Sequence, residues 1–151
     1  MNYKLLINAL FFFLIGVVCG GYFFSESVPR AFLDVRKCQN RCYTAREIAG
    51  LITSAGILKA PFAIPDVVME SDSCLAIRHP FPQAKHHFVL FPKHDVRDIF
   101  SLKLVDTPYV MGCFAIVHDL VKENKLFRYR VYTNGRGMQE IAYLHFHLIS
   151  Y

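Results

Sequence analysis

The feature that most constrains this chain is an uncharged apolar run near its amino end. From Leu5 to Phe24 no side chain is charged, and Asn8 is the one strongly polar residue. A helix rises about 1.5 Å per residue, so twenty residues cover about 30 Å, the hydrocarbon thickness of a bilayer. The run therefore predicts a single-pass membrane anchor over residues 1–24, which makes the lipid bilayer the first expected partner of the chain.

A signal peptide is the alternative interpretation of this run. A cleaved signal has an apolar stretch of about 7–15 residues and small residues before the cut. Here the run is longer, ends in three aromatic residues (22–24) and lacks an A-x-A-like site, so a retained anchor or an uncleaved signal is expected. Basic residues after the run (Arg30, Arg36, Lys37 and Arg41) slightly favour a cytoplasmic domain, but Lys4 before it leaves the membrane side open.

The charge and cysteine content argue against two broad classes of protein. The formal net charge is +5, but the basic residues are scattered and form no run longer than Arg36-Lys37, so no nucleic-acid partner is expected. Five cysteines are too few and too irregular for a disulfide scaffold, and we expect them to be unpaired small apolar residues. Cys38 and Cys42 are weak candidates for a metal site, or for a disulfide in an exported protein.

Residues 25–43 are mixed and charged, which predicts a juxtamembrane linker before a domain over residues 44–151. Thr44 and Glu47 fit a capping box at the start of a helix that ends at Gly56. The apolar stripe of this helix is expected to face the core; it consists of Ile48, Leu51, Ile52 and Ala55.

Five apolar segments downstream predict strands. They cover residues 63–70, 74–77, 87–91, 126–133 and 141–149, with a helical turn at 95–102 and a helix from Thr107 to about Asn124. Strands in meander order with two helices indicate an α+β domain with a five-stranded antiparallel sheet.

The last predicted strand carries the residues with chemical potential. Side chains alternate between the two faces of a strand, so Tyr143, His145 and His147 are expected on one face, with alternate residues roughly 6–7 Å apart. A lone histidine on a strand is usually structural, whereas two on one face after a glycine-containing turn indicate a site. From the residues alone, metal binding and nucleophilic catalysis have equal weight.

Two segments resemble motifs of the histidine triad (HIT) family. Residues 139–148, Q-E-I-A-Y-L-H-F-H-L, resemble its Q-h-x-h-H-h-H-h-H-h signature, where h is apolar. Residues 82–93, P-Q-A-K-H-H-F-V-L-F-P-K, resemble its P-x-A-x-x-H-x-L-V-I-P-K strand, and residues 131–137 resemble its N-x-G turn. The resemblance covers roughly residues 67–148. It implies a five-stranded antiparallel sheet with two helices, a homodimer, and no cofactor.

The resemblance also implies an activity: hydrolysis or transfer at the α-phosphate of a nucleotide conjugate, a phosphoramidate or a dinucleotide, through a nucleotidyl-histidine intermediate. His145 corresponds to the nucleophile, His147 to a donor to a phosphate oxygen, and His87 to a residue that orients or polarises the site. Asn134 matches the turn asparagine and Gln139 lies near the leaving group. A neutral imidazole is a competent nucleophile near pH 7.

Three departures from the family pattern support an alternative function. Tyr143 replaces the first histidine of the triad, His79 stands where the family has a ribose-binding aspartate, and the turn between Asn134 and Gln139 is shorter. The alternative is a catalytically weak or inert HIT-fold protein that binds nucleotides or acts as a scaffold at the membrane. A metal protein that uses Cys38, Cys42 and histidines is the third hypothesis.

Overall fold

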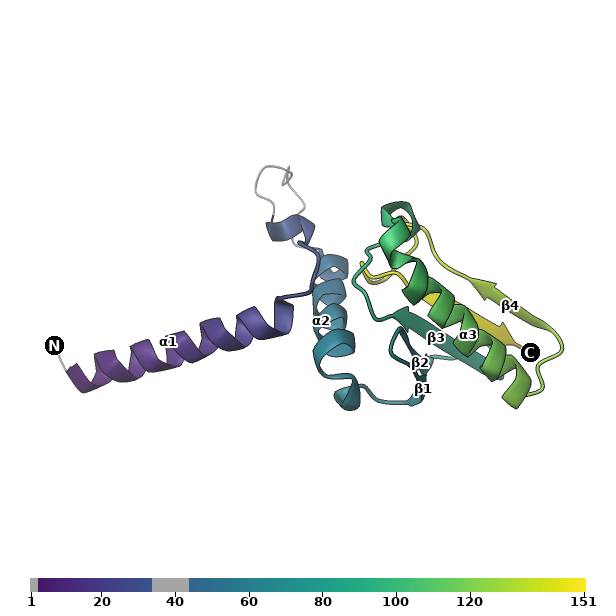
Figure 1. Cartoon of the computed structure of the whole chain (residues 1–151), viewed down its shortest axis with the longest axis horizontal. Helices are drawn as coiled ribbons and strands as arrows, with labels where there is room; N and C mark the ends of the chain where they lie inside the picture. Colours follow the sequence, from purple (N-terminus) through teal and green to yellow (C-terminus); the bar gives the residue numbers. More distant parts are fainter. Residues whose placement is uncertain (1–2, 34–43) are drawn as a thin grey trace.

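The computed structural model describes residues 3–33 and 44–151, so Cys38 and Cys42 lie outside the described residues. In chain order its helices and strands are α1 (Tyr3–Phe24), α2 (Ala45–Lys59), β1 (Val67–Glu70), β2 (Cys74–Arg78), β3 (His86–Pro92), α3 (Thr107–Glu123), β4 (Tyr129–Tyr132) and β5 (Phe146–Ser150). Figure 1 shows α1 projecting away from the sheet and the other helices.

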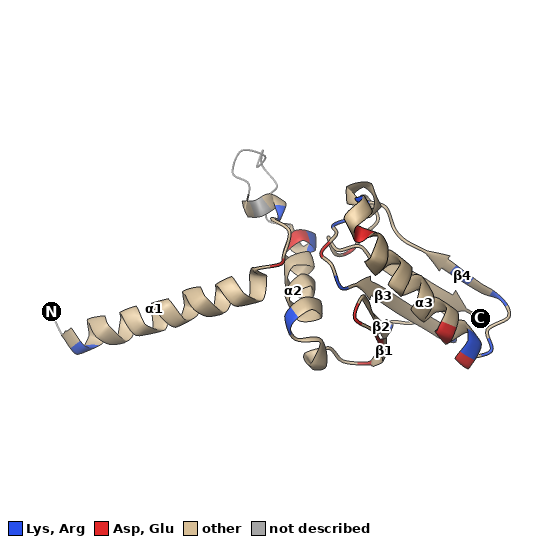
Figure 2. Cartoon of the chain, viewed as in Figure 1, with Lys and Arg blue, Asp and Glu red and all other residues tan. Residues whose placement is uncertain are grey.

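The apolar amino-terminal run forms the helix that the sequence predicts. Within the described residues, α1 and the segment Leu104–Glu123 are long and apolar enough to cross a membrane. The second segment contains α3, which packs on the sheet as a core helix, whereas no residue of α1 is buried. Figure 2 shows no charged residue in α1 beyond its first turn.

The five strands form one antiparallel sheet in the order β1-β2-β3-β5-β4, which confirms the predicted α+β class. The last strand is shorter than predicted, because β5 begins at Phe146 and not at residue 141. The amide of Ala142 donates to the carbonyl of Arg46 in α2, and that of Leu144 donates to Val96. These bonds hold residues 141–144 outside the sheet. Side chains in this segment therefore do not alternate between the two faces of the sheet.

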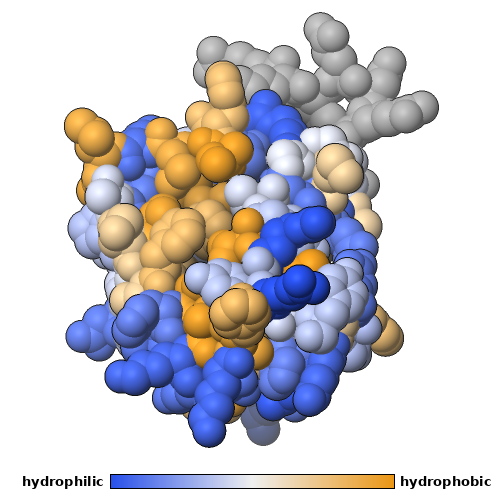
Figure 3. Space-filling model, turned by 90° about the vertical axis from the view of Figure 1, so that its right-hand side faces the viewer, coloured by the Kyte–Doolittle hydropathy of each residue, from blue (hydrophilic) through white to orange (hydrophobic). Residues whose placement is uncertain are grey.

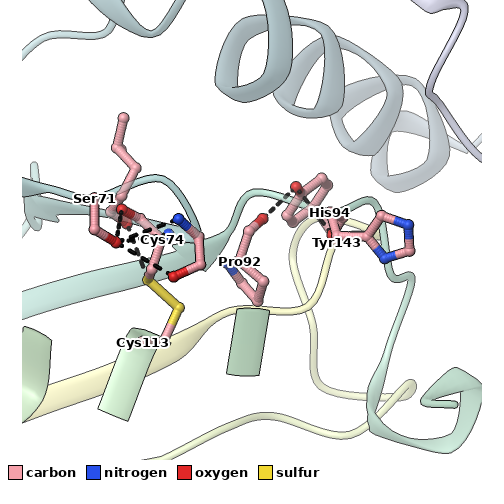
Figure 4. Close-up of a disulfide and its surroundings, with 8 residues drawn as sticks. Ser71, Cys74, Pro92, His94, Cys113 and Tyr143 are labelled. Carbon is pink, nitrogen blue, oxygen red and sulfur yellow. Dashed lines mark hydrogen bonds between the residues drawn. A yellow bond between two sulfur atoms is a disulfide. The ribbon is translucent and has the colours of Figure 1, made fainter. Parts of the chain in front are cut away.

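Helix α3 covers one face of the sheet and builds the larger core. Alternate residues of β2, β3 and β5 point toward it, including Ala76, Leu90 and Leu148. Cys74 at the start of β2 and Cys113 in α3 form a disulfide within this core (Figure 4). The expectation that these two cysteines are unpaired is therefore wrong. Helix packing brings together residues that are 39 positions apart in the sequence.

Helix α2 covers part of the opposite face, where Ile57 packs with Leu75, Phe91 and Tyr143. Gly50 permits the close approach, because a Cβ at this position would lie 2.6 Å from the carbonyl oxygen of Ala142. The residues of α2 that are buried are Glu47, Gly50, Ser54, Ala55 and Ile57.

The face of α2 that packs on the sheet is not the predicted one. Of the expected apolar stripe, Ile48 and Ile52 are 41% and 63% exposed, and Ala55 is buried but lines the groove next to α1, so the stripe points away from the sheet. The predicted capping box is half formed: the Thr44 hydroxyl accepts from the Glu47 amide, but the Glu47 carboxylate pairs with Arg97. Because the buried side chains Glu47 and Ser54 have polar partners, this less apolar face can pack inward.

Candidate active site

A cleft of about 370 Å³ lies on the sheet face that α2 partly covers. The end of β2, strand β3, strand β5 and the turn after β4 form its walls. Its polar lining contains four histidines together with Asn134 and Glu140; the histidines are His79, His87, His145 and His147. The structure therefore brings together five of the residues that the sequence proposed for the site.

Two of these histidines are held by a directional chain of hydrogen bonds. The backbone N–H of Gln83 donates to Nδ1 of His87 over 3.2 Å, so the proton of this neutral ring is on Nε2. Nε2 of His87 then donates to Nδ1 of His147 over 3.0 Å. The proton of His147 is consequently on its Nε2, a buried atom without a hydrogen-bond partner among the described residues. A ligand atom that accepts a hydrogen bond would satisfy this donor.

His145 has the opposite tautomer. Its Nδ1 lies 2.7 Å from the carbonyl oxygen of Tyr143, which can only accept, so Nδ1 carries the proton. The lone pair of His145 is therefore on Nε2. The rings of His145 and His147 are 5.0 Å apart between centroids. The cleft thus presents one unprotonated imidazole nitrogen next to one imidazole N–H.

Burial keeps these imidazoles neutral. Desolvation, followed by the charges of neighbouring histidines, lowers the pKa of His147 to about 3. Desolvation and His79 lower the pKa of His87 to about 4. The pKa of His145 is also lowered by desolvation, although the Tyr143 carbonyl and the Glu140 carboxylate oppose the effect. A neutral His145 can attack an electrophile near pH 7, and a neutral His147 remains a donor.

His79 forms the outer side of the histidine cluster. Its ring stacks on His87 with centroids 4.0 Å apart, and its Nδ1 accepts from the amide of Phe81. Ring nitrogens of His79, His87 and His147 lie within 4.8 Å of one another, close enough to hold a metal ion. Both nitrogens of His87 already have hydrogen-bond partners, so a metal at this place would break that chain of bonds.

Tyr143 and Gln139 do not line the cleft. The Tyr143 phenol is fully buried and donates to the carbonyl of Pro92 over 2.6 Å, as Figure 4 shows. The carboxamide of Gln139 donates to the carbonyls of Arg97 and Tyr143. Contrary to the placement expected from the sequence, neither side chain reaches into the cleft. Residues 141–144 leave the strand and turn Tyr143 inward, and Gln139 bonds to the Tyr143 carbonyl that also accepts from His145.

Sequence reasoning missed three contributors to the site. Tyr132 of β4 stacks on His147 with centroids 4.8 Å apart, because the two residues are paired in the sheet. Glu140 lines the cleft, and the backbone N–H of Gln83 fixes the tautomer of His87. Strand pairing could have revealed Tyr132, whereas a backbone donor leaves no signal in the sequence.

Comparisons with known proteins agree with this geometry. A family model described as "HIT domain" matches residues 63–151. An uncharacterized HIT-like protein of Synechococcus elongatus is 28% identical over 88 residues, which cover 56% of this chain and 77% of the relative.

Two solved structures show the same fold. A HIT family hydrolase from Legionella pneumophila has a TM-score of 0.57 at 27% identity. The match covers 62% of this chain and 88% of the Legionella pneumophila chain. A histidine triad protein from Clostridium difficile has a TM-score of 0.59 at 24% identity. The match covers 66% of this chain and 89% of the Clostridium difficile chain.

Proposed function

The chain belongs to the HIT domain family, and from this premise we propose that it hydrolyses or transfers the nucleotidyl group of a nucleotide conjugate. The observation that carries the proposal is the pair of opposite tautomers in the cleft. Nε2 of His145 has a free lone pair, and Nε2–H of the neighbouring His147 has no partner among the residues described. A nucleophile beside a donor for a phosphate oxygen is what attack on an α-phosphate requires.

The first step forms a bond between Nε2 of His145 and the α-phosphorus. The bond from phosphorus to the leaving group breaks, and the leaving group departs with that electron pair. His145 then carries the nucleotidyl group as a cationic ring, whose Nδ1–H remains bonded to the Tyr143 carbonyl. Throughout this step His147 donates to a non-bridging phosphate oxygen and stabilises the charge that develops there.

The second step regenerates the enzyme. Water attacks the phosphorus, the bond to Nε2 breaks, and its electron pair returns to His145. One proton of the water passes to the leaving group or to the solvent, so the sum is hydrolysis of one bond. If a different acceptor takes the place of water, the same step is a transfer.

The placement of Tyr143 also bears on the alternative hypothesis of a catalytically inert HIT-fold protein. The replacement of the first triad histidine suggested a damaged site, but this position packs against the Pro92 carbonyl and takes no part in lining the cleft. His145, His147 and His87 remain together in the cleft. This arrangement favours an active enzyme over a scaffold.

Substitution of single histidines in the full chain tests the proposal. With nucleoside phosphoramidates and dinucleotides as probes, His145→Ala is expected to abolish turnover and covalent nucleotide labelling. His147→Ala is expected to slow turnover by roughly 10²–10³-fold, the loss typical for one oxyanion donor. His118→Ala is the matched control, because His118 is an exposed histidine of α3. Absence of turnover in the wild type, together with nucleotide binding, would support the scaffold instead.

We also propose a location and an assembly state for the domain. Helix α1 would anchor it in a membrane, and retention of the protein in the membrane fraction after alkaline carbonate treatment tests this. The Cys74–Cys113 disulfide favours an oxidising compartment, opposite to the side that the flanking basic residues slightly favoured. Thiol alkylation in whole cells, with and without reductant, distinguishes the two sides.

Figure 3 shows apolar side chains on the face turned away from α1, where two copies could meet as a homodimer.

A further inference from the structure

The segment after α1 is fastened to the domain and is not a free tether. The Ser27 hydroxyl is 2.8 Å from that of Ser54 in α2, and Glu26 pairs with Lys59 at the end of the same helix. Farther along, the buried guanidinium of Arg30 pairs with Asp95. The carboxyl end of α1 is therefore held at a fixed place against α2.

The exposed apolar stripe of α2 lies on the side where α1 is attached. Successive helical residues are about 100° apart, so Ile48 and Ile52 lie opposite Gly50 and Ile57, which face the sheet. An apolar groove between the two helices is lined by Ile52 together with Phe23 and Phe24 of α1. Figure 1 shows α2 running crosswise to α1. If α1 crosses a bilayer, α2 lies along its surface with this stripe toward the lipid.

The cleft lies on the face of the sheet that α2 partly covers. Because α2 and the histidines share one face of the sheet, the outer side of α2 and the mouth of the cleft point in the same direction. The lining of the mouth includes two strongly exposed apolar side chains, Phe81 (81%) and Met138 (76%). Exposed apolar side chains around a phosphate-binding site match a ligand that is polar at one end and apolar at the other.

We propose that the cleft takes its substrate from the membrane surface: a nucleotide conjugate whose leaving group is a lipid phosphate. This inference rests on the proposed nucleotidyl chemistry and adds the class of leaving group. Nε2 of His145 bonds to the nucleoside-bearing phosphorus, and the bridging P–O bond breaks. The lipid phosphate then leaves with the electron pair on its oxygen. Water later releases the nucleotide from His145, and its proton passes to the solvent.

The kinetic test uses the full chain in vesicles, with two probes that share a head group. Cytidine diphosphate diacylglycerol is placed in the same bilayer, and cytidine diphosphate glycerol is dissolved outside. We expect a kcat/KM for the lipid probe roughly tenfold or more above that for the soluble probe, because confinement to one surface raises the effective concentration. Phe81→Ser is expected to lower this ratio several-fold, whereas Phe127→Ser, a matched change at an exposed phenylalanine (94%), is expected to preserve it.

The outcomes separate this inference from the proposed function. Equal kcat/KM for both probes, with both activities lost in His145→Ala, would overturn the lipid substrate and leave the nucleotidyl chemistry standing. If the wild type turns over neither these probes nor soluble phosphoramidates and dinucleotides, the proposed function fails and the lipid substrate fails with it.

A second test measures the orientation directly and needs no substrate. The chain contains no tryptophan, so a single introduced tryptophan is the only one that fluoresces as an indole. In vesicles that contain brominated phospholipid, we expect quenching for Ile52→Trp and Phe81→Trp but not for Phe127→Trp. Residue 127 belongs to the segment between α3 and β4. This segment lies on the side away from α1 (Figure 1). Quenching at 127 without quenching at 81 would overturn the orientation.

Discussion

Restoring the first histidine of the triad, with the change Tyr143→His, is expected to destabilise the protein without raising its turnover. The Tyr143 ring is fully buried among Ile57, Leu75 and Phe91, outside the cleft. An imidazole at this position would lie outside the cleft, since the side chain points toward the Pro92 carbonyl and does not line the cleft. The substitution therefore acts on folding and not on chemistry.

The hydrogen bond of the phenol sets the size of the effect. Its O–H donates to the Pro92 carbonyl over 2.6 Å, and Tyr143→Phe leaves this buried oxygen without the donor. An unsatisfied buried group costs about 1–3 kcal/mol. With an m-value of about 2 kcal/mol/M, a loss of about 2 kcal/mol lowers the urea midpoint by roughly 1 M. Tyr143→His removes the same bond and also leaves space beside Ile57, so its midpoint should fall further.

Urea unfolding of the full chain in mild detergent measures the loss, and turnover is measured well below the midpoint. Tyr132→Phe is the matched control, because within the described residues the Tyr132 hydroxyl forms no hydrogen bond. Tyr132→Phe also keeps the ring that stacks on His147. A rise in turnover with Tyr143→His, or a large fall with Tyr143→Phe at full folding, would refute the conclusion that this phenol is structural.

Four further predictions concern stability and assembly. Because the pKa values of His87 and His147 are lowered to about 4 and 3, the unfolded chain binds more protons below about pH 6.5. Their contribution to stability is therefore full above that pH and falls toward pH 3, as urea midpoints across this range can show. Asp95→Asn leaves the buried Arg30 guanidinium without its counter-ion and should cost about 3–5 kcal/mol in the same assay. Glu26→Gln breaks an ion pair whose carboxylate is 60% exposed and should cost below about 1 kcal/mol. Light scattering of the full chain in detergent is expected to give a dimer, and a monomer would contradict the proposed assembly.

Local patterns in the sequence determined most of the sheet and two of the site residues. Strand alternation requires only that a segment be extended, so the spacing of two residues predicted that His145 and His147 face the same cleft, although β5 itself begins at Phe146. Helix α1 and the Thr44 cap also follow from local sequence. The apolar composition of its residues defines α1, and the side chain of one residue, Thr44, defines the cap. The family resemblance added His87, which pairs through its ring with His147.

Tertiary structure alone decided which faces are buried and which atoms carry protons. The apolar stripe of α2 pointed toward α1 and not toward the sheet, because the helix has a neighbour on each side and Gly50 admits the backbone of Ala142. The Cys74–Cys113 disulfide depends on α3 crossing the sheet, and the inward turn of Tyr143 depends on the bond between Ala142 and Arg46. The proton on His147 is fixed by a backbone N–H of Gln83 acting through His87. The bonds from Ala142 and Gln83 use main-chain atoms that every residue shares, so residue types along the chain carry no trace of them. The disulfide and the approach at Gly50 depend on residue type, but their partners are distant in the sequence and are known only from the packing.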